Sequence, residues 1–260
     1  KLKDEYGRSS RFVESKEPIL SSVIVKKEHL LDQGCEFLFF LDENLVAKTI
    51  TVQDFKDFIL RDYSRPSVNP LSGLLPPKVA RMMVNIALGG KKKAGVFLDP
   101  FCGSGTMLME AVLAGSFSKI IGSDFDKRAV SDAKANLEWM YKAYPKIEKG
   151  NVELVKTDIR ELSQRIPVKI DFVATEVFLG PPLKDKLERE EADKIKRDLE
   201  KLYVDSFREL SRVVNPNSRV VIAFPLWVLK EGEIGAGDLE DKNNFVEIDW
   251  QKIAGTYGFK

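Results

Sequence analysis

The fold is decided by residues 96–106, which read Val96-Phe97-Leu98-Asp99-Pro100-Phe101-Cys102-Gly103-Ser104-Gly105-Thr106. A short apolar run ends in a carboxylate, and a loop of small residues then leads directly into the predicted helix 106–114. In a parallel α/β sheet, ligands bind beyond the carboxyl ends of the strands, and glycines let them approach the backbone closely. This stretch therefore predicts a ligand-binding turn between a buried strand and a helix.

Downstream of this turn, strand and helix patterns alternate along the chain. Apolar runs predict strands at 95–98, 119–123, 152–155, 170–174 and 220–224. Apolar residues at helical spacing predict helices at 79–87, 106–114, 129–144 and 186–213. Such alternation is typical of a doubly wound, mostly parallel sheet with helices on both faces. We therefore predict an α/β fold for this part of the chain.

The N-terminal part has a different pattern. Residues 19–25, 36–41 and 46–52 are rich in strand-forming residues, and a helical pattern begins at Phe55. A connector rich in Pro and Gly follows, from Arg65 to Pro77. We predict a small α+β linker segment over residues 1–65 and the α/β domain over residues 66–260.

Composition narrows the class of protein. The 260 residues include 41 basic and 40 acidic side chains, with a net charge of +1 and 43% hydrophobic residues, which is typical of a soluble globular protein. No apolar stretch approaches the roughly 18 residues of a membrane span. With one His and two Cys, the chain lacks the usual metal-ligand sets and a disulfide framework, so we expect no metal and a cytoplasmic location. Because the chain begins at Lys1, we expect it to be a fragment of a longer protein.

Three aspartates follow successive predicted strands. Asp99 ends the first, Asp124 the second and Asp158 the third. Asp124 lies about 20 residues beyond Gly103, the offset at which an acidic group meets ribose hydroxyls in nucleotide-binding units. A single aspartate in such a place can also be a helix N-cap or a turn residue. Together they favour a cofactor with an amine, ribose hydroxyls and adenine.

The octet 99–106 resembles the S-adenosylmethionine loop Asp-Pro-Phe-x-Gly-Ser-Gly-Thr of amino-group methyltransferases. Upstream, Arg61-Asp62-Tyr63-Ser64-Arg65-Pro66 and Gly73-Leu74-Leu75-Pro76-Pro77-Lys78 resemble a segment of the THUMP-associated tRNA guanosine-N2 methyltransferases. The resemblance covers nearly the whole chain and is strongest over residues 61–126. It implies a seven-stranded methyltransferase sheet, S-adenosylmethionine as cofactor, tRNA as substrate and a THUMP domain ahead of Lys1.

The resemblance also implies roles for the residues at the strand ends. Asp99 would hold the methionine amino group, Asp124 the ribose hydroxyls and Asp158 the adenine amino group. Gly103 and Gly105 would lie against the cofactor. The remaining expected cofactor-binding residues lie beside these in the sequence and are Pro100, Phe101, Thr106, Phe125 and Ile159.

The expected catalytic residues are Thr175, Glu176 and Phe178. In the family, the fourth strand ends in Asp/Asn-Pro-Pro-Tyr/Phe, which accepts hydrogen bonds from an exocyclic amine and stacks an aromatic ring on the base. Here Glu176 stands for the acidic residue and Phe178 for the ring, while the two prolines are displaced to 181–182. The expected reaction is methylation of the N2 amine of a tRNA guanosine.

Other substrates and a binding role stay open at this stage. The octet is shared by enzymes that methylate adenine N6 or other amines in DNA or RNA. The atypical motif is also compatible with a catalytically degenerate fold that binds RNA or a partner subunit. Phosphate contacts are expected from Lys91-Lys92-Lys93 and from Lys184, Lys186 and Arg189. A nucleotide-dependent oxidoreductase is disfavoured because Leu108 occupies the position of the third glycine in that fingerprint.

Overall fold

The computed structural model describes residues 12–13, 17, 19–68, 75–90, 94–115, 117–183, 185–230 and 245–260. The chain forms two compact units, Lys1–Leu60 and Arg61–Lys260. Segments 73–74, 91–93 and 184, for which the sequence predicts family or phosphate contacts, lie outside the described residues.

The first unit contains one short helix and a hairpin. Helix α2 (Ser22–Lys27) replaces the strand predicted at 19–25, so that prediction is wrong. The side chain of Ser21 caps the helix by accepting a hydrogen bond from the Ile24 backbone N–H, and two lysines occupy its last turn, where they complement the helix dipole. These end effects override the strand preference of the β-branched residues. The predicted hairpin is present as antiparallel strands β1 (Phe37–Phe40) and β2 (Leu45–Lys48).

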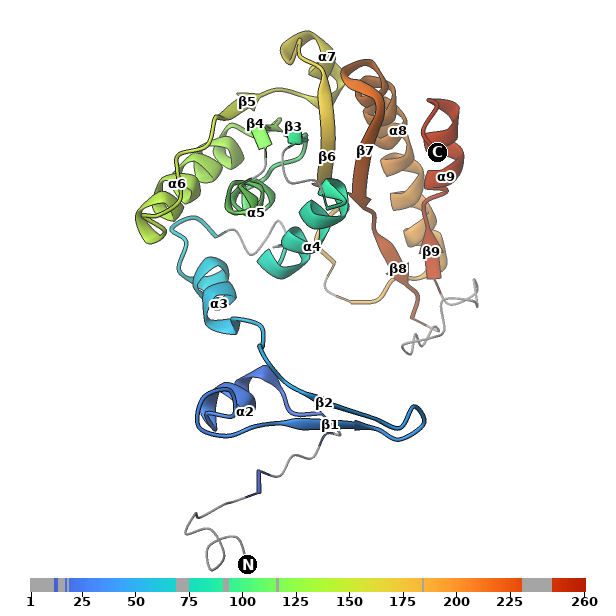
Figure 1. Cartoon of the computed structure of the whole chain (residues 1–260). Coiled ribbons are helices and arrows are strands. Elements are labelled where there is room, and N and C mark those ends of the chain that lie inside the picture. Colours follow the sequence, from blue (N-terminus) through green and yellow to red (C-terminus); the bar gives the residue numbers. More distant parts are fainter. Residues whose placement is uncertain are drawn as a thin grey trace, which may run out of the picture. The chain divides into compact units, whose positions relative to one another are not determined.

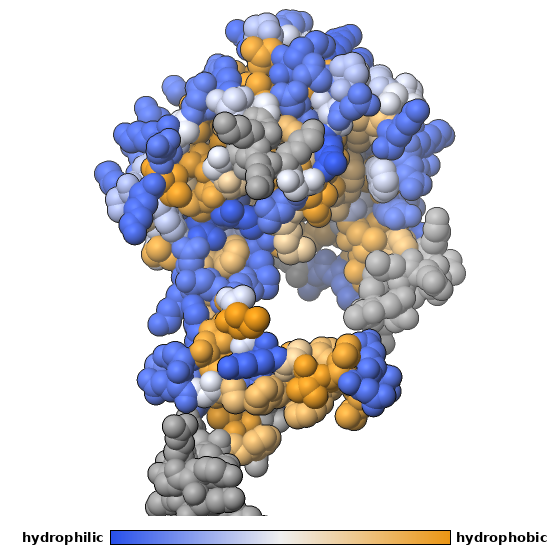
Figure 2. All heavy atoms as spheres, in the orientation of Figure 1, coloured by the Kyte–Doolittle hydropathy of each residue, from blue (hydrophilic) through white to orange (hydrophobic). Residues whose placement is uncertain are grey.

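Many large apolar side chains of the first unit are exposed. Figure 2 shows them as orange spheres over the hairpin. Phe39 is 68% exposed and Val46 is 61% exposed. A two-stranded sheet has marginal stability by itself. Helix α3 (Phe55–Tyr63) follows the hairpin and includes the position at which the chain passes from one unit to the other.

The second unit is built on a parallel sheet (Figure 1). Its strands are β3 (Ala94–Asp99), β4 (Phe117–Asp124), β5 (Val152–Lys156), β6 (Ile170–Glu176) and β7 (Val214–Ala223). Their order across the sheet is β5-β4-β3-β6-β7, and every pairing is parallel. Because the chain moves outward on one side of β3 and then on the other, the point of reversal lies between β3 and β6.

Helices cover both faces of the sheet (Figure 1). On one face lie α4 (Pro77–Leu88), α5 (Thr106–Ala114) and α6 (Lys127–Ala143). On the other lie the 3-10 helix η2 (Ile159–Glu161), α7 (Leu162–Arg165) and α8 (Arg189–Val213). Phe97 packs in the core beneath α4, α5 and α6, and Leu98 packs in the core beneath η2, α7 and α8. Both side chains are fully buried. Successive strand residues point to opposite faces, so β3 is buried on both sides. The predicted doubly wound α/β fold is confirmed.

Five strands form this sheet within the described residues, where the sequence resemblance implied seven. Two further strands, β8 (Leu226–Val228) and β9 (Phe245–Glu247), pair antiparallel in a separate small sheet. The described chain ends with helix α9 (Trp250–Thr256).

A buried ionic cluster joins the start of the second unit to α5. The carboxylate of Glu110 is fully buried and accepts from Arg61 Nε at 2.5 Å and from Arg81 Nε at 2.6 Å. Arg61 Nη1 also donates to the Tyr144 hydroxyl at 3.0 Å. Helices α3 and α4 are thereby attached to one carboxylate of α5, and Tyr144, the C-cap residue of α6, joins the cluster through Arg61. Removal of one partner from such a buried set leaves an uncompensated charge, which is strongly destabilising.

We therefore expect Glu110→Gln to lower the free energy of unfolding by about 3 kcal/mol or more, since it retains the size of the side chain and removes its charge. The control is Glu153→Gln, which breaks the half-exposed pair with Lys119 and should cost less than about 1 kcal/mol. Urea denaturation followed by circular dichroism measures both. Equal, small effects of the two substitutions would contradict a central role for the cluster.

Candidate active site

The glycine loop between β3 and α5 is shaped by two residues with left-handed backbone. Gly103 has φ +50° and Gly105 has φ +85°, a region that side chains rarely adopt. A Cβ at Gly105 would lie 3.1 Å from Ala133 Cα, so this glycine allows the loop to pack against α6. A Cβ at Gly103 would meet nothing within 4 Å, so that part of the loop backbone faces open space. The loop therefore offers a surface that a ligand can approach closely.

Asp99 ends β3 and is 3% exposed. Its Oδ1 accepts from the Thr175 hydroxyl at 2.6 Å and from the Phe101 backbone N–H at 3.2 Å. Burial raises the pKa of Asp99 to about 7, and the carboxylates of Asp124 and Glu176 add to this effect. A buried carboxyl of this kind is a good partner for a ligand ammonium group, because an added cation favours its charged form.

Asp124 ends β4, the neighbour of β3, and is held by backbone N–H groups. Its Oδ2 accepts from Gly103 at 3.0 Å, and its Oδ1 accepts from Asp126 at 2.9 Å. Burial raises the pKa of Asp124, while these two hydrogen bonds oppose the rise. The carboxylate therefore links the glycine loop to the end of β4, where a ligand lying on the loop would reach it.

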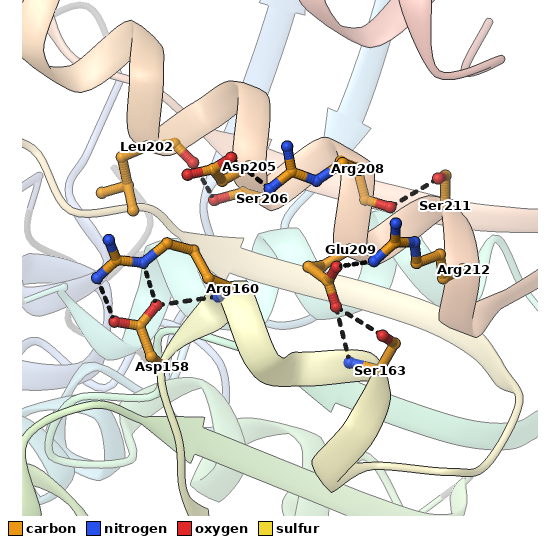
Figure 3. Close-up of polar contacts among 10 residues, drawn as sticks. All are labelled: Asp158, Arg160, Ser163, Leu202, Asp205, Ser206, Arg208, Glu209, Ser211 and Arg212. Atoms are coloured by element: carbon orange, nitrogen blue, oxygen red, sulfur yellow. Dashed lines mark hydrogen bonds and ion pairs between the residues drawn. The ribbon is translucent and has the colours of Figure 1, made fainter.

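Asp158 follows β5 and caps η2 by accepting from the Arg160 backbone N–H at 2.9 Å. Figure 3 shows that the Arg160 guanidinium also holds both carboxylate oxygens, with Nε–Oδ1 at 2.9 Å and Nη2–Oδ2 at 2.6 Å. The side-chain hydrogen bond from Arg160 lowers the pKa of Asp158. Asp158 is therefore a helix N-cap, one of the alternatives that the sequence left open for it.

The expected catalytic residues lie at the end of β6, beside Asp99. Thr175 is buried and donates to Asp99, whereas Glu176 is half-buried, and its burial raises its pKa. The ring of Phe178 is 51% exposed, while its backbone carbonyl accepts from the buried hydroxyl of Tyr203 at 2.7 Å. This end of the sheet thus combines a partly desolvated carboxylate with an aromatic ring on an anchored backbone.

The other predicted residues fall into two groups. Pro100, Thr106 and Ile159 are buried, and Phe101 is half-buried, so these four support the loop and its surroundings. Phe125 is 68% exposed and follows Asp124.

Three residues of this region were missed by the sequence analysis. Asn136 on α6 binds the backbones of Ser67 and Ser104, Arg65 donates to the Thr106 hydroxyl, and Tyr203 holds the Phe178 carbonyl. Of these three, only Arg65 lies in a stretch that the sequence analysis quotes, the segment Arg61–Pro66.

The donor set fits the cofactor implied by the resemblance. A buried carboxyl, a second carboxylate at the next strand end and an accessible glycine loop are suited to an amine and to hydroxyl groups rather than to pyrophosphate. The doubly wound sheet and this set of carboxylates are those expected of a methyltransferase domain of α/β type.

The comparison with protein families identifies the particular group. The model of the UPF0020 family, described as RMKL-like, methyltransferase domain, matches residues 68–228. This match covers more than half of the chain, and the chain belongs to that family. The prediction that the chain contains a methyltransferase domain is thereby confirmed, and the family match supports S-adenosylmethionine as the cofactor.

Two curated proteins are similar to part of this chain. A tRNA (guanine(10)-N2)-dimethyltransferase of Methanothermobacter thermautotrophicus is 36% identical over 46% of this chain and 31% of its own length. A protein of the same name from Methanocaldococcus jannaschii is 33% identical over 64% of this chain and 40% of its own. The chain therefore spans less than half the length of these relatives.

Among solved structures, TrmN from Thermus thermophilus is similar, with 20% identity, a TM-score of 0.46 and coverage of 69% of this chain and 45% of its own.

None of the helices in the described ranges is long and apolar enough to cross a membrane.

The raised pKa of Asp99 predicts how the stability of the ligand-free protein depends on pH. Between about pH 4 and pH 7, the unfolded chain releases this proton, while the folded chain retains it up to a pKa of about 7. The folded state then binds more protons, so this group lowers the free energy of unfolding as the pH rises through that window. Above about pH 7, this reduction in the free energy of unfolding stays constant.

We expect Asp99→Asn to flatten this part of the pH profile, as measured by thermal unfolding without cofactor. The control is Asp198→Asn, whose carboxylate on α8 is 69% exposed and should leave the profile unchanged. An Asp99→Asn profile that coincides with that of the parent chain would show that the carboxyl titrates normally.

Proposed function

We propose that this protein transfers a methyl group from S-adenosylmethionine to the exocyclic N2 amine of a guanosine in tRNA. The observation that carries the proposal is the arrangement at the point of reversal of the sheet. There, Asp99 on β3 and Glu176 on β6 lie at neighbouring strand ends, and the exposed ring of Phe178 follows. Two further supports are the family match and the relatives named tRNA (guanine(10)-N2)-dimethyltransferase.

The strand ends would divide the recognition of the cofactor among them. Asp99 is suited to the methionine ammonium group, because a cation beside this buried carboxyl offsets its desolvation. Asp124 is suited to accept hydrogen bonds from the ribose hydroxyls, and Asp158 one from the adenine amine. Gly103 and Gly105 let the ligand lie against the loop backbone.

When bound, S-adenosylmethionine supplies a methyl group on a sulfonium, and its transfer to an amine leaves a neutral thioether. The chain's own residues would orient the amine and accept its proton. Glu176 is suited to accept a hydrogen bond from the amine, since its raised pKa makes it a better base than an exposed glutamate. Phe178 offers a ring on which the target base can stack. Tyr203 keeps that loop in place through the Phe178 carbonyl.

The wider assignments from the sequence are part of the same proposal. A THUMP domain preceding Lys1 would bind the tRNA, and the expected location is the cytoplasm. Within the described residues, Lys186 and Arg189 lie near the Phe178 loop in sequence and would contact phosphates.

Transfer of labelled methyl groups to unmodified tRNA tests the reaction, followed by digestion to nucleosides and chromatography. We expect the label in N2-methylguanosine or its dimethyl form. Glu176→Gln should lower the rate by about 100-fold or more, because it removes the acceptor charge from the reacting amine. Glu161→Gln, an exposed carboxylate of η2, is the matched control and should retain the parent rate.

Other outcomes of this experiment would contradict parts of the proposal. Label in N6-methyladenosine would replace guanosine by adenine as the target. Cofactor binding with no transfer to any tRNA would favour a catalytically degenerate binding fold. A Glu176→Gln variant with the parent rate would remove Glu176 from the mechanism.

The ribose contact is tested by cofactor affinity alone. We expect Asp124→Ala to weaken S-adenosylmethionine binding by about tenfold or more in calorimetry, because two hydroxyl groups lose a charged acceptor. Asp198→Ala on α8 should bind as the parent does. Thermal unfolding of both variants shows whether the glycine loop, which Asp124 also holds, is preserved; a folded Asp124→Ala protein with unchanged affinity would contradict the assignment.

A further inference from the structure

Arg65 is a buried cation beside the glycine loop. Its side chain is 3% exposed, and its Nη1 donates to the hydroxyl of Thr106, the first residue of α5. Its Nε and Nη2 are buried, and neither has a hydrogen-bond partner among the described residues. Burial lowers the pKa of Arg65, and the charge of Asp62 only partly opposes this. A guanidinium in such surroundings is costly until an anion or further acceptors meet it.

The helix start that Arg65 contacts has no side-chain cap. Gly105 is the N-cap residue of α5, and among the described residues this helix start is without a side-chain cap hydrogen bond. The free N–H groups and the helix dipole give this end of the nine-residue helix a partial positive charge. The guanidinium and the uncapped first turn thus form one positive site at the end of the glycine loop.

The position of Arg65 relative to the loop is fixed by Asn136. The side-chain amide oxygen of Asn136 accepts from the Ser67 backbone N–H at 3.0 Å. Its amide nitrogen donates to the Ser67 carbonyl at 2.8 Å and to the Ser104 carbonyl at 2.9 Å. The segment that carries Arg65 is therefore bridged by Asn136 to residues 99–106. Asp99 stands at the beginning of this loop and the positive site at its end, so a carboxyl and a cation flank one ligand surface.

We propose that Arg65 and the first turn of α5 bind the carboxylate of the methionine moiety of S-adenosylmethionine. With Asp99 as the partner of the ammonium group, the loop would then recognise both charges of an α-amino acid. A carboxylate matches the planar guanidinium fork, which can donate two parallel hydrogen bonds to it. The proposal rests on the proposed cofactor role of Asp99 and extends it to a residue outside the octet.

The enclosure of Arg65 favours a small ligand over an RNA phosphate. With 3% of the side chain exposed, Nε and Nη2 meet a ligand only when the Arg65 side chain turns toward it. A single carboxylate lying on the loop needs less room for this than a polynucleotide backbone. Binding would thereby exchange an unsatisfied buried cation for an ion pair.

The test compares two ligands that differ only in the carboxylate, S-adenosylmethionine and decarboxylated S-adenosylmethionine. Calorimetry on the full chain measures both affinities in the parent and in Arg65→Gln. We expect the parent to prefer the carboxylated ligand by about tenfold or more, and Arg65→Gln to lose this preference by binding S-adenosylmethionine more weakly. Arg212→Gln, which removes a half-exposed arginine of α8, should keep the parent preference.

The outcomes separate this proposal from a structural role and from the proposed reaction. Equal weakening of both ligands in Arg65→Gln would mean that Arg65 only supports the loop, and unchanged affinities would mean that it has no role. If Arg65→Gln does not fold, the parent decides, because equal affinity for the two ligands overturns the proposal. A parent that prefers the carboxylate but methylates no tRNA refutes the proposed reaction and leaves this site standing.

Discussion

The burial of β3 on both faces is the constraint on which the site depends. Phe97 and Leu98 pack in the cores on opposite faces of the sheet, and β3 lies between β4 and β6. The strand is therefore enclosed on both faces and along both edges. Its last residue, Asp99, is therefore drawn into the interior with its carboxyl group. The strand ends at Asp124 and Glu176 lie on either side, and their charges raise the cost of ionising Asp99 further. The chemistry of the site follows from a packing requirement of the sheet.

A second constraint is the attachment of residues 61–68 to the same helix that follows the glycine loop. Arg61 pairs with Glu110 in the second turn of α5, and Arg65 contacts Thr106 in the first. The two arginines lie four residues apart and meet positions of α5 that are also four apart, as expected when two segments run side by side. The helix is thus held from outside the sheet, which stabilises the loop without a bound ligand.

Local signals explain how much of the fold could be predicted from the sequence. The helix from Thr106 to Ala114 has its predicted bounds, because a glycine stands at each end. The strand prediction at 19–25 was wrong because Ser21 caps a helix that begins at Ser22. That prediction gave more weight to strand propensity than to this cap. Contacts between distant residues were out of reach: Arg61 and Glu110 are 49 positions apart, and Arg65 and Thr106 are 41. Only folding reveals that Arg61, in α3, and Arg65, just after that helix, become buried.

The contacts of Asp158 show how one residue can be both an N-cap and a ligand-binding group. An ionised carboxylate has about four lone-pair sites on its two oxygens. In the structure, Oδ1 of Asp158 accepts from the backbone N–H and from Nε of Arg160, and Oδ2 accepts from Nη2 of Arg160. One site on Oδ2 is left, which is enough for a single amine donor such as that of adenine. The proposed adenine contact therefore does not require the ion pair to break, and Arg160 would hold the carboxylate in the orientation that presents this site.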